Sequence, residues 1–176
     1  CGNYKVHTFL SPGTFTVSSG GNSQGSNTVD YVIVAGGGSS SQGGTCTLNG
    51  AGGGGGGYRE TVPSPAAWTA SPLANPGAGV VVSASPGAYA IQVGAGGSRV
   101  GGCNHQPGLI GDVSSGLGIT SAGGGAGRRD YPSMGTPGST TADGGSGGGG
   151  GSPGPSAPGT NVPGGAGNTP PVSPPQ

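Results

Sequence analysis

The chain has 176 residues, of which 47 are glycine and 17 are proline, and its formal net charge at pH 7 is zero. Only 6% of the residues are charged, which argues against nucleic-acid binding because that function needs clustered Lys and Arg. Aromatic residues make up 5% of the chain, so a conventional side-chain core would be small. No apolar run approaches about 18 residues, and we therefore expect no membrane insertion.

Residues 1–35 are expected to form a β-hairpin and a central strand. Apolar and polar residues alternate from Tyr4 to Phe9, and Ser11–Pro12–Gly13 has the composition of a turn before the pattern resumes at 14–17. The most apolar run of the chain is Val29–Ala35, which predicts a strand buried on both faces.

Residues 36–132 are expected to form glycine-rich rods with loops and one inserted hairpin at 79–93. The scaffold of this region is the six-glycine run Gly52, Gly53, Gly54, Gly55, Gly56 and Gly57, and shorter runs recur at 36–38, 94–97, 123–125, 147–151 and 164–165. Glycine is unfavourable in a helix and has no side chain to pack in a sheet. Two alternatives remain open: a flexible linker, or polyglycine-II helices with about three residues per turn, packed backbone against backbone.

The inserted hairpin is predicted from two apolar runs, 80–84 and 88–93, joined by Ser85–Pro86–Gly87. Residues 85–91 echo residues 11–17. Prolines interrupt the insert 61–78, and 117–121 is a candidate last strand. Residues 133–176 are expected to form Gly/Pro-rich rods and a spacer. The predicted fold class is a small all-β region followed by a polyglycine-II bundle with long loops and essentially no α-helix.

Several of these segments, taken in order, resemble the glycine-rich domains of phage tail fibres and virion fibres. The resemblance rests on residues 4–17, Val29–Gly38, the run Gly52–Glu60, residues 91–97 and residues 119–125. It covers nearly the whole chain and implies a layered polyglycine-II scaffold whose loops contact the host, as in related tail-tip adhesins. The cysteines and the insert 61–78 depart from the family pattern.

The sequence offers little for catalysis, and we expect no enzyme, no cofactor and no metal. Cys103, His105 and Asp112 could form a thiol–base pair, but nothing in the sequence orients them. Zinc binding by His7, Cys46, Cys103 and His105 lacks paired spacing. His7 is better interpreted as a partly buried structural residue. No glycine run has the lysine that a phosphate-binding loop requires.

The candidate surface-binding residues lie in the loops 39–49, 103–116 and 128–143, together with the insert. They are Trp68, Arg128, Arg129, Tyr131 and Met134. Trp68 is equally compatible with a small core. In Tyr58–Arg59–Glu60 we expect the tyrosine to cap a glycine rod and the two charged residues to solvate it.

Three cysteines leave one unpaired if a disulfide forms. Cys46 and Cys103 are the candidate pair, since both lie in glycine-rich loops, and Cys1 would then be free or paired outside the chain. The start at Cys1 and the proline-rich tail 170–176 favour a processed chain or a fragment of a longer protein.

The sequence therefore predicts a structural virion protein of a phage, a fibre or tail-tip adhesin that contributes to host attachment. Its partners would be other virion proteins and a host receptor or glycan, without nucleic acid, and a homo-oligomer is compatible. The main alternative is a purely structural fibre or capsid-decoration segment. An ice-binding protein or an extracellular filament subunit ranks below these.

Overall fold

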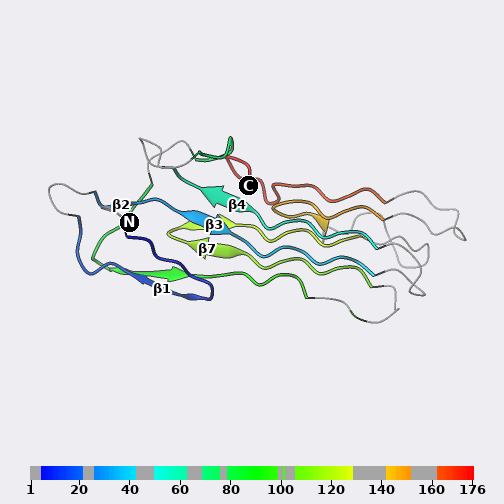
Figure 1. The fold of residues 1–176 in the computed structure, drawn as a ribbon, viewed down its shortest axis with the longest axis horizontal. Helices are drawn as coiled ribbons and strands as arrows, with labels where there is room; N and C mark the ends of the chain where they lie inside the picture. Colours follow the sequence, from blue (N-terminus) through cyan, green and yellow to red (C-terminus); the bar gives the residue numbers. More distant parts are fainter. Residues whose placement is uncertain are drawn as a thin grey trace, which may run out of the picture.

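The computed structural model describes residues 5–21, 26–42, 50–62, 69–75, 79–98, 101, 106–128, 142–151 and 162–176. Short strands occupy one end of the elongated molecule, and extended segments without strand pairing occupy the other (Figure 1). We call these the strand end and the rod end. The described residues contain no α-helix, and within them no helix could cross a membrane.

Short strands pair two by two at the strand end. They are β1 (Gly13–Thr16), β2 (Thr28–Val29), β3 (Val32–Val34), β4 (Tyr58–Glu60), β5 (Val80–Val81), β6 (Ala88–Ile91), β7 (Ser114–Gly116) and β8 (Ile119–Ser121). The antiparallel pairs are β1–β6, β2–β5, β3–β4 and β7–β8. The first three pairs are nested, because the chain runs out through β1, β2 and β3 and returns through β4, β5 and β6.

Both predicted local hairpins are wrong. β1 pairs with β6 and β5 pairs with β2, while residues 5–9 form no strand. The two Ser-Pro-Gly segments that echo each other thus supply the paired strands, with Phe15 opposite Tyr89 and their ring centroids 6.3 Å apart. Such cross-strand aromatic pairs stabilise an antiparallel sheet, which favours the long-range partner over the local one.

The predicted central strand is also wrong. The run 29–35 is divided between β2 and β3, and β3 is paired only with β4. Val32 and Val34 are 53% and 54% exposed because their side chains project from one face of this two-stranded sheet. The buried residues of the run are Tyr31 and Ala35.

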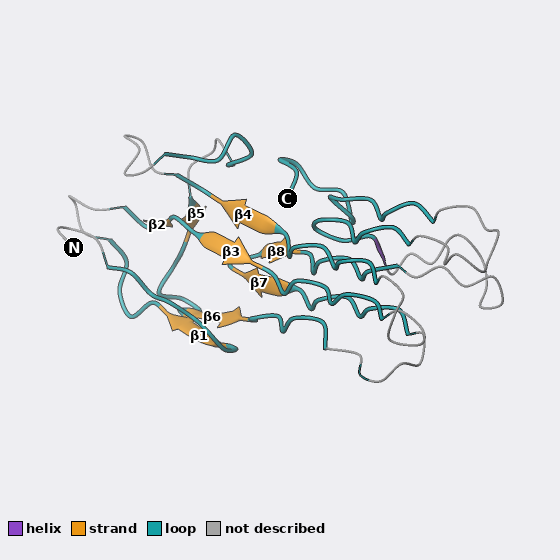
Figure 2. Ribbon diagram, turned by 45° about the vertical axis from the view of Figure 1, so that its right-hand side comes forward, coloured by secondary structure: helices purple, strands orange, loops and turns teal. Residues whose placement is uncertain are grey.

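Among the described residues, seven extended segments lie side by side at the rod end, and they carry no strand assignment over most of their length (Figure 2). We call them rods and name them by their residues: 35–42, 50–57, 93–98, 106–113, 122–128, 146–151 and 162–168. Each predicted glycine run from 36–38 to 164–165 falls within one of them.

Backbone hydrogen bonds between the rods recur at every third residue. In rod 35–42 one set of N–H groups donates to rod 50–57, and the set one residue later donates to rod 106–113. The first set joins Ala35, Gly38 and Ser41 to the carbonyls of Gly57, Gly54 and Ala51 at 3.0, 2.8 and 2.9 Å. The second joins Gly36, Ser39 and Gln42 to Asp112, Leu109 and Gln106 at 3.0, 2.8 and 2.9 Å. Successive residues of one rod therefore bond to different neighbours.

Rod 122–128 is the centre of this arrangement. Its backbone bonds to rods 35–42, 50–57, 106–113 and 146–151. Most of its residues are buried, and Ala126 is among the most buried apolar residues described. The core of the rod end is therefore largely main chain.

The rods approach so closely that many of their glycines have no room for a side chain. A methyl group on Gly38, Gly54 or Gly124 would overlap the carbonyl oxygen of Gly125, Ser146 or Gly54, respectively. Gly52 is different, since a methyl group there would meet nothing within 4 Å. Position in the rod, rather than glycine content alone, thus decides where glycine is required.

A tight hairpin and a folded tail complete the fold. The candidate strand 117–121 is confirmed only over Ile119–Ser121, which form β8. Leu117 and Gly118 instead form the two-residue turn from β7, with φ of 55° and 79°. The predicted spacer at 170–176 instead folds back, because the Gln176 side-chain oxygen accepts the Ala122 N–H at 2.7 Å. The Asn168 carboxamide accepts the N–H groups of Val172 and Gln176 and thereby holds this turn.

Candidate functional site

We call the far tip of the rods the distal end. The described chain reaches it at several points. These points are Gln42, Gly50, Gln106, Arg128, Gly151 and Val162, each next to a stretch outside the described residues. Figure 1 shows the rods ending together on the side opposite β1 and β2. The distal end therefore collects chain segments that are far apart in the sequence.

Hydrogen bonds fix these points relative to one another. The Gln42 N–H donates to the Gln106 carbonyl at 2.9 Å, and the Val162 N–H donates to Gly151 at 3.1 Å. The buried Ser41 hydroxyl donates to the Arg128 carbonyl at 2.9 Å and accepts the Ala51 N–H at 2.8 Å. Serine can serve here because its short side chain reaches the neighbouring backbone.

Arg128 is the predicted binding residue that the structure describes. Its N–H donates to the Gly149 carbonyl at 3.0 Å, and its guanidinium Nη1 donates to the Pro163 carbonyl at 3.2 Å. Arg128 therefore joins three rods at the distal end. This bracing role was not predicted from the sequence.

The other predicted binding residues, Trp68, Arg129, Tyr131 and Met134, lie outside the described residues, as do the candidate disulfide cysteines Cys46 and Cys103. His105 also lies outside them, so the proposed thiol–base pair is not described. The described ranges contain no group of three or more His, Cys, Asp and Glu side chains able to hold a metal. His7 is exposed, with its ring edge-on to Phe15 at 5.2 Å, so its predicted burial is wrong.

Parts of the predicted binding loops belong to the scaffold instead. Residues 39–42 continue a rod, and 106–113 form a rod leading into β7. Rod 106–113 was missed because it has glycine only at Gly108 and Gly111, both buried, whose N–H groups bond to rod 122–128. A spacing of three between small residues is the signal that would have identified it.

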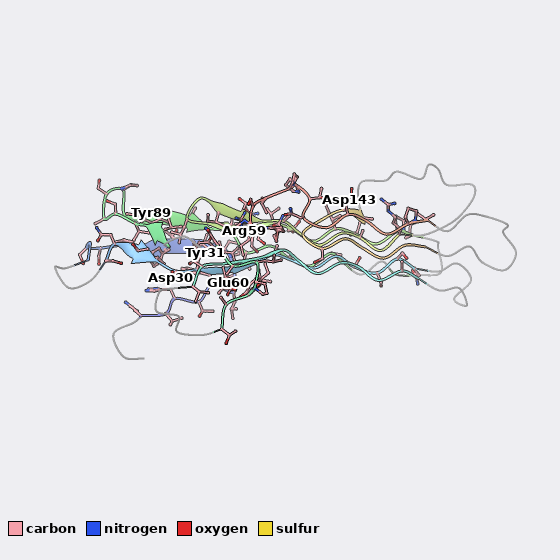
Figure 3. All side chains as sticks on the ribbon, turned by 90° about the horizontal axis from the view of Figure 1, so that it is seen from above. Asp30, Tyr31, Arg59, Glu60, Tyr89 and Asp143 are labelled. Carbon is pink, nitrogen blue, oxygen red and sulfur yellow. The ribbon has the colours of Figure 1, made fainter. Side chains whose placement is uncertain are left out.

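A second polar site lies at the strand end, around Glu60. The predicted solvating role of Glu60 is wrong, because this carboxylate is only 3% exposed. It accepts the Tyr58 hydroxyl at 2.8 Å and the Ser71 N–H at 2.7 Å. The hydrogen bond to Glu60, followed by burial and the carboxylate charge, raises the pKa of Tyr58. Figure 3 shows Glu60 near Asp30 and Tyr31.

Thr61 extends this polar site and was not singled out from the sequence. It is fully buried, and its hydroxyl donates to Asp30 Oδ1 at 3.1 Å while accepting the Tyr31 N–H at 3.0 Å. No sequence pattern marks it, since its burial follows from the β3–β4 pairing.

Comparison of the chain with protein-family models, with curated proteins and with solved structures found no match. The functional interpretation therefore depends on the sequence and on the geometry above.

Proposed function

We propose that the rods form a polyglycine-II bundle. Three observations support this: hydrogen bonds that recur at every third residue, donors directed in turn to different neighbours, and glycines without room for a Cβ. A polyglycine-II helix has about three residues per turn and no internal hydrogen bonds, so its backbone groups must be satisfied by neighbouring helices.

We further propose that the protein is a structural virion fibre or tail-tip protein of a phage that presents chain segments to the host surface at its distal end. The observation that carries this proposal is the convergence of five of the six described residues flanking segments 43–49, 129–141 and 152–161 on one hydrogen-bonded tip: Gln42, Gly50, Arg128, Gly151 and Val162. Rigid scaffolds commonly carry their binding residues on such connecting segments.

The composition of these segments favours a neutral, polar ligand. Segments 43–49 and 152–161 contain no charged residue, and 129–141 contains Arg129 followed by Asp130. Ser, Thr and Asn recur in them, and their side chains donate and accept hydrogen bonds as glycan hydroxyls do. A host glycan is therefore the preferred receptor, and other virion proteins are the structural partners.

Adsorption competition tests this function. Excess purified protein is added to the parent phage and its host, beside a variant with segment 129–141 replaced by a Gly/Ser segment of equal length. Blocking by the intact protein and loss of blocking by the variant are expected. The control replaces the exposed strand-end residues 18–21, which should leave blocking unchanged.

If a large excess of folded protein leaves adsorption unchanged, receptor binding is refuted. The purely structural alternative, a fibre or capsid-decoration segment, then becomes the better account. The interlocked rods support that alternative equally well, because a stiff spacer needs the same scaffold.

A further inference from the structure

The rods lie in two layers, and one of these layers is covered on a single side (Figure 3). We call the layer made of rods 35–42, 50–57 and 93–98 the outer layer, and rod 35–42 its middle rod. The middle rod bonds to both of its partners in the layer and to rods 106–113 and 122–128 behind it. These four neighbours also bond to one another in sequence. They therefore enclose one side of the middle rod, and among the described residues its other side is open.

This open side, which we call the open face, carries unpaired backbone groups at every third residue. In the middle rod, the N–H groups of Gly37 and Ser40 have no acceptor among the described residues. In rod 50–57, both the N–H and the carbonyl of Gly53 and Gly56 lack a partner within the same part of the chain. Residues three apart project from the same side of a rod with three residues per turn, so each rod presents a regular row of such groups.

The side chains on the open face are small or apolar. Ser40 is exposed, and the face continues onto β3 and β4, where Val34 and Tyr58 lie opposite each other and are 54% and 41% exposed. β3 contacts β7 and β8, which lead into rods 106–113 and 122–128 behind the outer layer. The exposed valine and tyrosine side chains therefore point to the same side as the open face.

A second copy of this chain fits the open face in both spacing and charge. Backbone groups three residues apart recur about every 9 Å along a rod, whereas those on one side of a β-strand recur about every 7 Å. A rod face of the same repeat matches this spacing, and a strand edge does not. The three rods of the outer layer contain no charged residue, so two copies bring no like charges together.

A two-fold axis between the middle rod and rod 50–57 makes the open face complementary to itself. The middle rod offers donors at Gly37 and Ser40, and rod 50–57 offers carbonyls at Gly53 and Gly56, with the same separation along the chain. About such an axis, the middle rod of each copy lies against rod 50–57 of the other. We propose that the protein forms a homodimer through the open face, in which the rods of two copies build one thicker bundle.

The size of the open face predicts a weak dimer. The eight residues of the middle rod span about 25 Å, and three rods spaced like neighbouring strands are about 15 Å wide. With β3 and β4 included, two copies would bury on the order of 1,000 Å², near the lower limit for a specific interface. The dimer does not depend on host attachment: a monomer that blocks phage adsorption would refute the dimer and leave the proposed function intact.

Sedimentation velocity of the whole 176-residue chain, from about 10 µM to about 1 mM, tests this proposal. We expect monomer at the low end and dimer at the high end. Ser40→Asp places an uncompensated charge in the interface and should weaken association at least about tenfold. The matched control, Ile110→Asp, adds the same charge at a 52% exposed residue of rod 106–113 in the other layer, and should leave association unchanged.

Amide hydrogen exchange at both ends of this concentration range identifies the face. The four N–H groups of the open face should exchange rapidly in the monomer and at least about fivefold more slowly in the dimer. The N–H groups of Gly52 and Gly55 belong to rod 50–57 but project from another side, and they should stay fast at both concentrations.

A chain that stays monomeric at the highest concentration would overturn the proposal. So would association that Ile110→Asp abolishes and Ser40→Asp does not, since the other layer would then form the contact. Species that keep growing beyond the dimer would also contradict it, because a two-fold contact closes at two copies. If Ser40→Asp loses the slow amides of Gly54 and Gly57 and is therefore misfolded, Val34→Asp probes the same face, and unchanged association in that variant would refute the dimer.

Discussion

The strand end and the rod end are stabilised in opposite ways. At the strand end, short strand pairs place side chains such as Val82 and Tyr31 in the interior and leave Val81 72% exposed. At the rod end, the interior is main chain, and side chains would prevent the approach of neighbouring rods. Substitutions should therefore have opposite effects on stability in the two regions. Removing side-chain atoms should destabilise the strand end, and adding them should destabilise the rod end.

The largest expected effect comes from adding one methyl group inside the six-glycine run. Gly54→Ala should lower the free energy of unfolding by at least about 3 kcal/mol, because the methyl group would overlap the Ser146 carbonyl and force the rods apart. Gly52→Ala, in the same run, should change it by less than about 0.5 kcal/mol, because its methyl group faces open space. Urea unfolding of the two variants measures the difference.

Equal effects of Gly52→Ala and Gly54→Ala would contradict the packing described for the rods. A small loss of unfolding free energy in both variants would favour a loose, linker-like glycine run. A large loss in both would indicate rods that are buried on all sides.

A disulfide bond would add a covalent link at the rod end. Gln42 and Gln106 are hydrogen-bonded neighbours, and Cys46 and Cys103 lie four and three residues from them in the sequence. We predict that these cysteines pair, and that reduction lowers stability by about 2–4 kcal/mol. Peptide mass mapping without reductant, with Cys1→Ser as the control, would detect the bond. A free Cys46 thiol in the folded protein would refute it.

At the strand end the expected effect follows the loss of atoms. Val82 is 6% exposed, and Val82→Ala should cost about 2 kcal/mol from lost burial and the cavity left behind. Val81→Ala, one residue away and exposed, should cost less than about 0.5 kcal/mol. Thermal unfolding of the two valine variants measures this difference. A larger loss of stability in Val81→Ala than in Val82→Ala would show that the exposed face is covered in solution.

The smallest expected effect is a gain in stability at the turn that joins β7 to β8. Leu117 has a φ of 55°, which is unfavourable for a leucine, and Gly118 follows it with a φ of 79°. Asn-Gly is the preferred pair in such a turn, so Leu117→Asn should raise stability by about 0.5–1 kcal/mol. Thermal unfolding checks this, and a loss of stability would show that the Leu117 side chain contributes more by packing than its backbone costs.

The sequence anticipated the rods better than the strands. Runs such as 52–57 and 123–125 drew attention to these segments because consecutive glycines are unfavourable in a helix and have no side chains to pack in a sheet, which left packed rods or a flexible linker as the alternatives. Strand partners were missed because β2 and β5 have only two residues each, and so short a pattern does not specify its partner. The β2–β5 and β3–β4 pairs form across long sequence separations, with rods 35–42 and 50–57 lying between β3 and β4.

The polar sites were only partly accessible from the sequence. Arg128 was selected as a binding residue, but its contacts with Gly149 and Pro163 depend on rods that meet only in the folded chain. Glu60 was taken for a surface charge because glutamate is rarely buried without partners, and its donor Ser71 lies 11 residues further along the chain, within the insert. The burial of Glu60 can be recognised only once the position of its donor Ser71 in the fold is known.

Amide hydrogen exchange tests the central claim, the three-residue repeat of backbone hydrogen bonding, most directly. In rod 50–57 the N–H groups of Gly54 and Gly57 donate to rod 122–128 at 2.7 and 2.8 Å, whereas those of Gly52, Gly53 and Gly55 have no backbone partner among the described residues. Residue-resolved exchange should therefore show slow amides at 54 and 57 separated by fast ones. Slow amides at every second residue, or uniformly fast exchange along the run, would contradict the account.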